Sequence, residues 1–258
     1  MAIKEITSLH NPLIQSLRLL EKPKGRREQG LLLAEGRKMT AEALEAGLCT
    51  LLLVDSDKKE VFAALIQQAE AKGIDVAIVS PAVMSGFCIA KSPQGIACTA
   101  KIPASPEKLS GNLLLALDGI QDPGNMGTIL RTADAAGFEG VLLGEGCADP
   151  TGPKALQSTM GSVYRLPLQH TPDLASALAA LRGEGYKVIA SELGGGDFYH
   201  DLPSGPSVLV IGNEGNGISP AVSREATHHL ALPMRGGAES LNAAVAAGIM
   251  MYEMSRDK

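Results

Sequence analysis

The pattern of apolar and polar positions along the chain predicts alternating helices and strands. In the first 100 residues, short apolar runs predict strands, and stretches with apolar residues three and four apart predict helices. The predicted helices cover residues 12–20, 38–46 and 58–72, and the predicted strands cover 31–36, 49–54 and 76–79. Together these elements form a small αβ sandwich.

The rest of the chain alternates strands and helices more regularly. The predicted strands cover 113–119, 140–144, 164–168, 187–192 and 207–212, and the predicted helices cover 126–136, 153–160, 174–181, 220–226 and 241–254. Runs such as LLLAL and VLVIG are typical of strands buried on both faces. We therefore predict an α/β fold with a mainly parallel sheet and helices on both faces. Ligands bind such sheets beyond the carboxyl ends of the strands, so we expect chemistry in the loops after Leu117, Val210 and Leu230.

A boundary between two domains is indicated at residues 101–112, where two prolines, two serines and a glycine separate apolar segments. We place the first domain at residues 1–105, a linker at 106–112 and the second domain at 113–258. Residues 1–110 carry 14 basic and 12 acidic residues (net +2), whereas residues 111–258 carry 9 and 16 (net −7). The second part also holds 22 of the 29 glycines. The net charge of −5 therefore averages two parts of different character.

Composition excludes several classes of protein. With four Phe, four Tyr and no Trp, the chain is a poor candidate for RNA-binding modules that stack bases on aromatic side chains. No apolar run is long enough to span a membrane, and the N-terminus lacks the apolar segment of a secretory leader, which predicts a cytoplasmic protein. The cysteines and histidines form no C-x-x-C or H-E-x-x-H pattern, so we predict no metal site.

Familiar nucleotide-binding loops do not fit the glycines of the second part. Gly144 and Gly146 follow a predicted strand, but Asp149 stands at the third glycine position of G-x-G-x-x-G. The segment 119–124 begins like a Walker A loop, but Asn125 stands where that loop has its lysine. The G-x-S-x-G elbow of α/β-hydrolases does not occur. Dehydrogenases, P-loop NTPases and α/β-hydrolases are therefore disfavoured.

Three polar, glycine-containing segments remain, each after a predicted strand. They are 118–137, 208–219 and 230–253. In the first, Asn125 is a natural N-cap for the following helix, and Arg131 is a cation on a mostly apolar helix that needs an acceptor nearby. In the second, glycines around Glu214 allow either a tight turn or a close approach of a ligand to the backbone. In the third, Ser240 is an ordinary N-cap for the last helix.

Read together, these segments resemble a known family. The strings N-x-G-x-x-x-R-T-A, V-I-G-N-E-G-x-G-I-S and L-P-M-x-x-x-x-x-S-L-N-A-A-V-A resemble, in order and in spacing, three motifs of the SpoU (TrmH-type) RNA 2'-O-ribose methyltransferases of the SPOUT superfamily. In the first part, LLLAEGRKMTAEAL and SPQGIACTA resemble the family's N-terminal substrate-binding domain, which is itself similar to RNA-binding ribosomal proteins. This likeness favours an RNA-contacting role for the basic stretch 18–38, with Lys24, Arg26, Arg27 and Arg37 as candidate contacts, over a merely solvated surface.

The resemblance implies a fold feature that the hydrophobic pattern does not predict, a deep trefoil knot in the C-terminal part. It also implies that S-adenosylmethionine binds in the knot against the backbone of the second and third motifs. The residues implied as cofactor contacts are Gly212, Leu232 and Leu241, with Ile211, Asn213, Ile218 and Met234 nearby.

The resemblance further implies how the reaction is carried out. Arg131 stands at the position of the family's key arginine, either as a strongly perturbed base or, more economically, as a group that binds the target phosphate and orients the nucleotide. Asn125 and Glu214 are expected to fix Arg131 and the substrate, and Ser240 and Asn242 to shape the reacting pocket. No metal is required.

The expected partners follow from the same likeness. They are RNA and a second copy of the chain, since family members form homodimers, and the last helix offers small and apolar residues for close packing. The larger N-terminal domain favours ribosomal RNA as the substrate. The alternatives are a tRNA 2'-O-methyltransferase, and a non-catalytic RNA-binding or ribosome assembly factor on the same scaffold.

Overall fold

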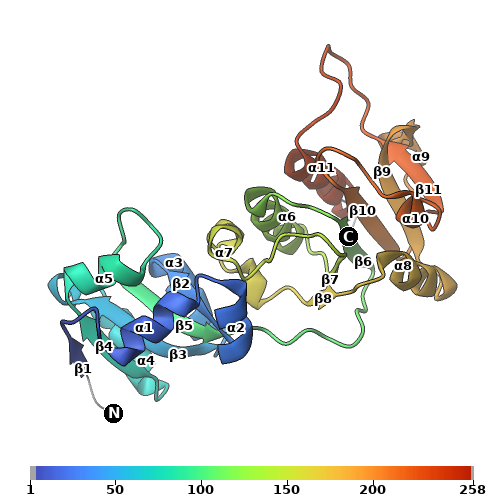
Figure 1. Cartoon of the computed structure of the whole chain (residues 1–258). Coiled ribbons are helices and arrows are strands. Elements are labelled where there is room, and N and C mark those ends of the chain that lie inside the picture. Colours follow the sequence, from blue (N-terminus) through green and yellow to red (C-terminus); the bar gives the residue numbers. More distant parts are fainter. Residues whose placement is uncertain (1–3, 257–258) are drawn as a thin grey trace. The chain divides into compact units, whose positions relative to one another are not determined.

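The computed structural model describes residues 4–256, which form two compact units. The first unit contains the residues up to Ala104 together with the segment Thr151–Tyr164, and the second contains Ser105–Pro150 and Arg165 onward. The segment 151–164 is thus an excursion of the chain that packs with the N-terminal unit (Figure 1).

The first unit is a five-stranded mixed sheet with helices packed against it. Its strands are β1 (Lys4–Ile6), β2 (Leu31–Glu35), β3 (Cys49–Asp55), β4 (Asp75–Val79) and β5 (Ile96–Lys101), in the order β1-β4-β3-β5-β2. Strand β5 runs antiparallel to both β2 and β3, and the other pairs are parallel. The helices are α1 (Pro12–Leu19), α2 (Pro23–Gln29), α3 (Arg37–Glu45), α4 (Ala63–Ala71), α5 (Pro81–Phe87) and, from the excursion, α7 (Pro153–Thr159), with short 3-10 turns η1 (Ser56–Lys58) and η2 (Ser162–Tyr164).

The second unit is built on six parallel strands. These are β6 (Leu113–Asp118), β7 (Gly140–Leu143), β8 (Leu168–His170), β9 (Lys187–Asp197), β10 (Ser207–Gly212) and β11 (His228–Ala231), in the order β11-β9-β10-β6-β7-β8. The helices are α6 (Pro123–Ala135), α8 (Leu174–Gly183), α9 (Phe198–Asp201), α10 (Pro220–Ser223) and α11 (Ala243–Ser255). The predicted α/β class with a parallel sheet is confirmed. The predicted strand 164–168 is wrong, because the strand begins only at Leu168 after the 3-10 turn η2.

Helices cover both faces of this sheet. On one face, alternate residues of the central strands, such as Leu114, Ala116, Val208 and Val210, pack with α8 and α10. The residues between them, including Leu115 and Leu209, are equally buried and point to the opposite face. Helices α6 and α11 pack against each other there, and α11 contacts β10. Burial on both faces explains the unbroken apolar runs of β6 and β10.

In both helices that carry motif residues, the N-cap is a different residue from the predicted one. Helix α6 starts at Pro123, and its cap is Asp122, whose Oδ1 accepts from the backbone N–H of Asn125 at 2.8 Å. Helix α11 is capped by Asn242 rather than Ser240. Asn125 and Ser240 are therefore released from capping and available to the site. Within residues 4–256, no helix has the length and apolar character needed to cross a membrane.

Candidate active site

The loops after β6 and β10 meet at Glu214. Strands β6 and β10 are parallel neighbours in register up to the pair Asp118 and Gly212, so both loops leave the sheet at the same edge. The Glu214 carboxylate accepts hydrogen bonds from the backbone N–H groups of Gln121 (3.2 Å) and Asp122 (3.1 Å) and from Nδ2 of Asn125 (3.0 Å). Glu214 therefore holds the start of α6 against the second motif.

Asn125 and Asn242 join the third motif to this cluster. The Asn125 amide donates to Glu214, while its Oδ1 accepts from Nδ2 of Asn242 at 3.0 Å. Oδ1 of Asn242 in turn accepts from the N–H groups of Ala244 and Val245 at the start of α11. One chain of hydrogen bonds thus connects polar residues from the three sequence motifs, which lie up to 117 positions apart.

The surroundings of Glu214 keep it ionised. Desolvation acts to raise its pKa, but the hydrogen bonds from the Asn125 amide and from backbone N–H groups outweigh it. The pKa of Glu214 consequently lies below the ordinary value of a glutamate. At neutral pH this residue is a fixed hydrogen-bond acceptor rather than a proton donor.

A tight turn after β10 is stabilised by Asn213. The backbone N–H and C=O of Asn213 pair with those of Gly217 at 2.9 Å each, and its Oδ1 accepts from the N–H groups of Gly215 and Asn216. Its Nδ2 donates to the carbonyl oxygen of Gly119 at 2.7 Å. Asn213 thus ties its own turn to the loop after β6.

Gly212 packs directly under this turn. A Cβ at Gly212 would overlap the carbonyl carbon of Gly217 and the nitrogen of Ile218. The close approach of these two backbone segments accounts for the glycine that begins the motif.

Beside the turn lies a pocket of about 250 Å³, between the middle of β9, the ends of β10 and β11 and the start of α11. Six of the seven predicted cofactor contacts line it, namely Ile211, Gly212, Asn213, Leu232, Met234 and Leu241. Ile218 is outside the lining and packs instead on the α8 side of the sheet. Glu214 and Ser240 also face the pocket.

Arg131 stands apart from this pocket. It is exposed on α6 and is not among the lining residues, and its side chain forms no hydrogen bond or ion pair with any residue in the range 4–256. Six positions separate it from Asn125, which places the two side chains on different sides of the helix. The neighbouring Thr132 faces Gly248 of α11, since its methyl carbon lies 3.5 Å from where a Cβ at Gly248 would be. Helix α6 therefore lies beside α11, and the Arg131 guanidinium, on another side of α6, is open to a ligand.

Sequence reasoning missed two parts of the site. Oδ2 of Asp118 accepts from the N–H of Ser219 at 2.7 Å, which closes the far end of the glycine turn onto β6. Ser191, Glu192 and Leu193 form one wall of the pocket. The position of Asp118 at the end of a predicted strand could have indicated a role in the site. The sequence of β9 has no feature that distinguishes its pocket-lining residues from those of an ordinary strand.

Known proteins with the same arrangement identify the family. The SpoU rRNA Methylase family matches residues 112–252, which contain the whole hydrogen-bonded cluster and its pocket, and the MRM3-like substrate binding domain matches residues 11–98. The chain belongs to the SpoU rRNA methylase family.

Individual SpoU relatives resemble the chain over its whole length. The 23S rRNA (guanosine(2553)-2'-O)-methyltransferase RlmP of Bacillus subtilis is 35% identical over 98% of this chain and 99% of its own. The AdoMet-bound rRNA methyltransferase of Sinorhizobium meliloti has a TM-score of 0.84 at 36% identity, covering 99% and 98% of the two chains. The SpoU methyltransferase AviRb of Streptomyces viridochromogenes, in complex with AdoMet, has a TM-score of 0.84 at 26% identity, covering 96% and 98%. The family, the enzyme class and the cofactor predicted from the three motifs are confirmed.

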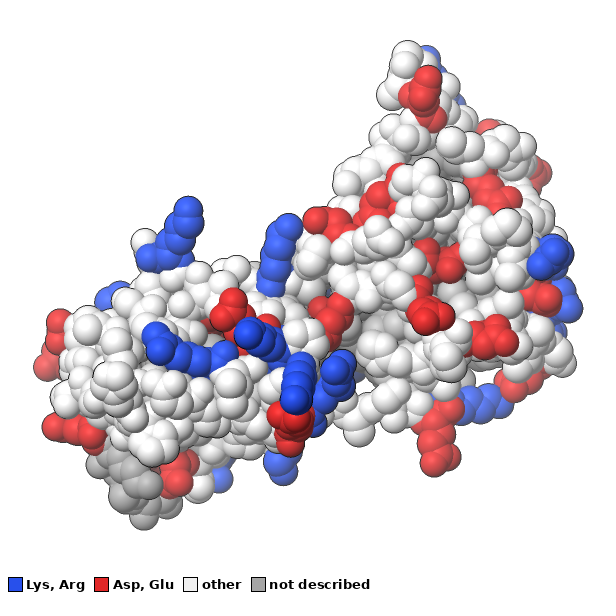
Figure 2. Space-filling view, in the orientation of Figure 1, with Lys and Arg blue, Asp and Glu red and all other residues white. Residues whose placement is uncertain are grey.

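In the N-terminal unit, the predicted RNA contacts of this SpoU chain fall into two groups. Lys24, Arg27 and Arg37 are exposed, and Figure 2 shows Lys and Arg side chains gathered on this unit. Arg26 is only 2% exposed, and its guanidinium donates to the carbonyl oxygens of Leu20 and Glu21 and to the Thr151 hydroxyl. Its buried side chain therefore links the turn between α1 and α2 to the start of the excursion 151–164.

Substituting the two neighbouring arginines should therefore have different effects. Arg27→Ala should weaken RNA binding and reduce its salt dependence, because one phosphate contact is lost, without changing the melting temperature. Arg26→Ala should cost about 1–3 kcal/mol of stability, because buried carbonyl groups lose their donor. Thermal melting and RNA titrations at several salt concentrations measure both effects. Equal RNA affinity for Arg27→Ala and wild type would show that this surface is merely solvated.

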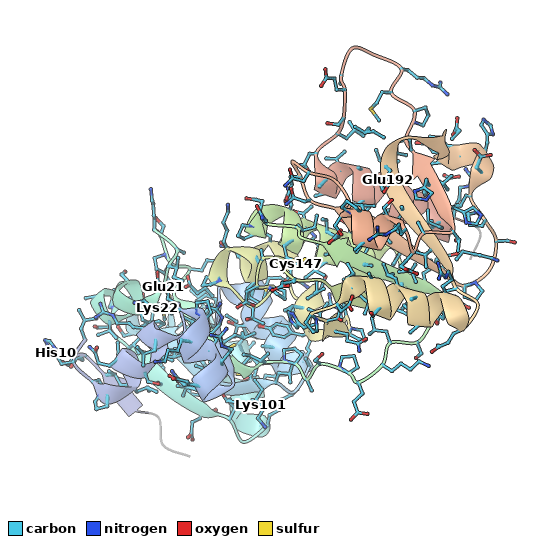
Figure 3. The ribbon with its side chains drawn as sticks, turned by 45° about the vertical axis from the view of Figure 1, so that its right-hand side comes forward. His10, Glu21, Lys22, Lys101, Cys147 and Glu192 are labelled. Carbon is cyan, nitrogen blue, oxygen red and sulfur yellow. The ribbon has the colours of Figure 1, made fainter. Side chains whose placement is uncertain are left out.

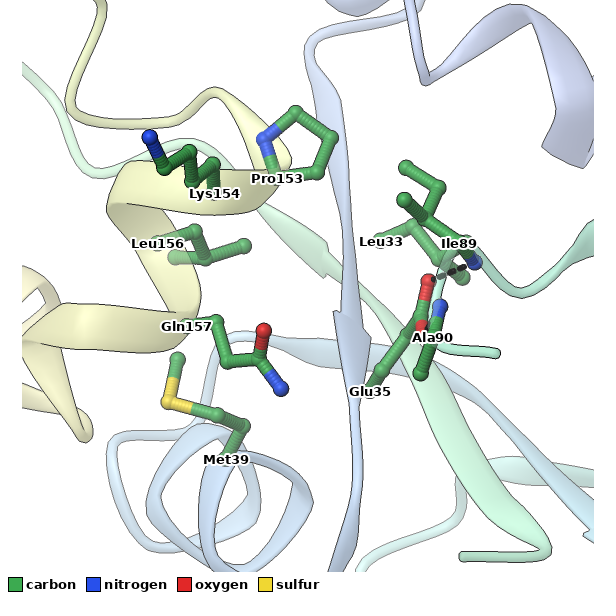
Figure 4. A pocket seen from close by; sticks show the side chains of 9 residues that line it. All are labelled: Leu33, Glu35, Met39, Ile89, Ala90, Pro153, Lys154, Leu156 and Gln157. Carbon is green, nitrogen blue, oxygen red and sulfur yellow. Dashed lines mark hydrogen bonds between the residues drawn. The ribbon is translucent and has the colours of Figure 1, made fainter. Parts of the chain in front are cut away.

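The N-terminal unit also contains a cavity of about 280 Å³ between β2, α3 and α7. Its apolar lining includes Leu33, Met39 and Leu156, and Gln157 is a polar member of the lining (Figure 4). The Glu35 carboxylate, also in the lining, accepts from the backbone N–H groups of Ile89 (2.7 Å) and Ala90 (3.1 Å). Glu35 thereby fixes the loop after α5 at the rim of this cavity.

Proposed function

We propose that this chain transfers a methyl group from S-adenosylmethionine to a ribose 2'-hydroxyl of ribosomal RNA. The observation that carries the proposal is the hydrogen-bonded chain from Glu214 through Asn125 to Asn242, placed beside a pocket walled by the glycine turn. This arrangement joins the three motifs of an RNA methylase family around one cavity.

The pocket suits an adenosine-containing cofactor. The absence of a side chain at Gly212 lets the turn 213–217 fold back closely and form part of the pocket wall. Leu232, Leu241 and Met250 supply an apolar surface for the base, and backbone N–H and C=O groups are available for its polar edge. We assign Ile211, Gly212, Asn213, Leu232, Met234 and Leu241 to the cofactor.

The bound cofactor supplies an electrophilic methyl group, so the protein must align the 2'-hydroxyl and help to remove its proton. A guanidinium stays protonated under ordinary conditions and is a poor base, so we assign Arg131 to the target phosphate, which it can bind bidentately. Asn125, held by Glu214 and Asn242, offers an amide whose orientation is fixed from both sides. Ser240 faces the pocket and is free to contact the ribose.

Ribosomal RNA is favoured over tRNA by the N-terminal unit. Residues 11–98 match a substrate-binding domain, and RlmP, which aligns with almost the whole chain, is named for a 23S rRNA nucleotide. A folded domain with Lys24, Arg27 and Arg37 on its surface suits the selection of RNA by shape and phosphate contacts. We propose the cytoplasm as the location, since the substrate is found there.

We also propose that two copies associate through α11. Val245, Ile249 and Tyr252 are exposed at spacings of four and three residues, and so form one apolar stripe of the helix, with the exposed Leu241 just before its N-cap. Arg131 is exposed on α6, the helix that packs against α11, and it lies outside the pocket of its own chain. We propose that association through this stripe brings Arg131 toward the cofactor pocket of the second subunit.

Charges placed in the stripe should therefore separate the subunits. The double substitution Val245→Asp and Ile249→Asp should convert a dimer to a monomer and abolish methyl transfer, because each carboxylate would be buried without a partner. Light scattering after size-exclusion chromatography measures the mass. Val61→Asp, at a more exposed apolar residue of the N-terminal unit, is the control and should remain dimeric. A monomeric wild-type protein would refute the proposed association.

The proposed reaction is tested with methyl-labelled S-adenosylmethionine and ribosomal RNA from cells that lack this protein. We expect label on ribose, mapped to a defined 2'-O position. Label confined to bases would refute the reaction type, and label confined to tRNA would favour the alternative substrate. RNA binding without any cofactor binding would indicate the non-catalytic factor instead.

A further inference from the structure

Strand β9 leaves the sheet where it reaches the pocket. It pairs with β10 only from Lys187 to Ala190. Against β11, Ala190 is opposite His229, but Gly196 is opposite the next residue, Leu230. Residues 191–195 are thus additional residues on β9 that have no counterpart on β11 and form an irregular bulge of five residues.

The bulge is closed tightly at its far end by Gly195. A Cβ at this position would lie 2.7 Å from the carbonyl carbon of His229 and 2.8 Å from the nitrogen of Leu230, so only glycine allows β9 to rejoin β11 here. The consequence is that Ser191, Glu192 and Leu193 are turned out of the strand pairing and form a wall of the cofactor pocket.

Glu192 is the charged residue of this wall (Figure 3). Its Oε2 is 2.8 Å from Nδ1 of His229, which fixes the orientation of the carboxylate. Its Oε1 has no hydrogen-bond partner among residues 4–256. One carboxylate oxygen is therefore held, and the other is available to a ligand.

The charged residues that line the pocket are all acidic. Its lining contains the carboxylates of Glu192 and Glu214, and none of the lining residues within the described part of the chain is Lys, Arg or His. Both oxygens of Glu214 already accept hydrogen bonds from the loop after β6. Glu192 is consequently the carboxylate that is free to respond to the charge of a bound molecule.

We propose that Glu192 makes the pocket selective for the positively charged form of the cofactor over its neutral product. This inference rests on the proposed function. S-adenosylmethionine carries a sulfonium. Transfer of its methyl group forms the new O–C bond, the 2'-hydroxyl proton passes to water, and the electron pair of the broken S–C bond returns to sulfur. The sulfur of S-adenosylhomocysteine is therefore neutral, and the attraction to a nearby carboxylate is lost. A pocket with this preference binds the substrate and releases the product.

The test compares the affinities of the two molecules by calorimetry on the full-length protein. Glu192→Gln keeps the shape and removes the charge, so it should weaken S-adenosylmethionine binding by about tenfold and S-adenosylhomocysteine binding by no more than about twofold. Sinefungin, in which a protonated amine replaces the sulfonium, should behave like S-adenosylmethionine. Glu145→Gln, at an exposed glutamate outside the pocket, makes the same change in net charge and should leave all three affinities unchanged.

The outcomes separate this inference from the proposed function. If Glu192→Gln weakens both molecules equally, Glu192 contacts a part that they share, such as the ribose hydroxyls or the amino group, and the selectivity is refuted. If neither affinity changes in a variant that melts like wild type, Glu192 does not act on the cofactor at all. If the wild-type protein binds neither molecule, the proposed cofactor itself is refuted, and this inference with it.

Discussion

Arg131→Ala should reduce methyl transfer by about 10³-fold or more, while the affinity for S-adenosylmethionine stays within about threefold of wild type. The reason is positional, because Arg131 does not line the pocket and has no protein partner within residues 4–256. Its loss removes nothing from the cofactor site and nothing from the folded state. It removes the cation proposed to hold the target phosphate, on which the alignment of the 2'-hydroxyl depends.

Single-turnover methyl transfer and calorimetric cofactor binding measure the two quantities separately. Arg131→Lys should recover part of the rate, because a lysine keeps the charge but cannot form the bidentate contact. Thr128→Ala is a neighbouring control, since this exposed residue lies one turn earlier on α6 and should have little effect. A large loss of cofactor affinity in Arg131→Ala would contradict the assigned role. Full activity would show that Arg131 takes no part in the reaction.

The sequence predicted which residues form the active site, but it did not predict the hydrogen bonds that they make. The order and spacing of the three motifs were sufficient to name Asn125, Glu214 and Asn242, which the structure joins in one hydrogen-bonded chain. Local rules then predicted the wrong N-cap twice. Asp122 and Ser240 are both good capping residues, as are Asn125 and Asn242, so composition alone does not choose among them. The choice depends on Glu214, which binds the Asn125 amide and the N–H of Asp122 across 89 and 92 positions.

The strands that are buried on both faces of the sheet could be predicted from the sequence. Strands β6 and β10 are buried on both faces, and their apolar runs predicted them with correct boundaries to within one residue. Helix α2 was missed because its sequence PKGRREQ contains a proline, a glycine and mostly charged residues, and it is held instead by the buried Arg26. The end of β9 was not predicted either, because the partner of each residue, and not its type, determines where a bulge begins.

The excursion 151–164 shows a further limit of reading the chain in order. We predicted it as part of the second domain, yet these residues pack with the N-terminal unit. Arg26 donates to the Thr151 hydroxyl at one end, and beyond the other end Arg165 forms a salt bridge of 2.7 Å with Asp134 on α6. Hydrophobic periodicity predicts helix α7, but it contains no information about which sheet the helix will join.

Gly212→Ala should reduce the affinity for S-adenosylmethionine by about 100-fold or more and abolish methyl transfer. The added methyl group would overlap backbone atoms of Gly217 and Ile218, and backbone cannot move aside as the end of a flexible side chain can. The turn 213–217 would have to shift outward, which breaks its paired hydrogen bonds between Asn213 and Gly217. Both the wall of the pocket and the position of Glu214 depend on this turn.

Gly215→Ala is the matched control in the same turn. The nearest atom to a Cβ at Gly215 is Oδ1 of Asn213 at 3.6 Å, which is an ordinary contact, so this variant should bind the cofactor within about threefold of wild type. Calorimetry gives the affinities, and thermal melting in the absence of cofactor shows whether either variant is folded. If both alanine variants bind alike, the close approach at Gly212 is not what shapes the pocket. If Gly212→Ala remains folded and only its cofactor binding fails, the glycine turn serves the cofactor rather than the stability of the sheet.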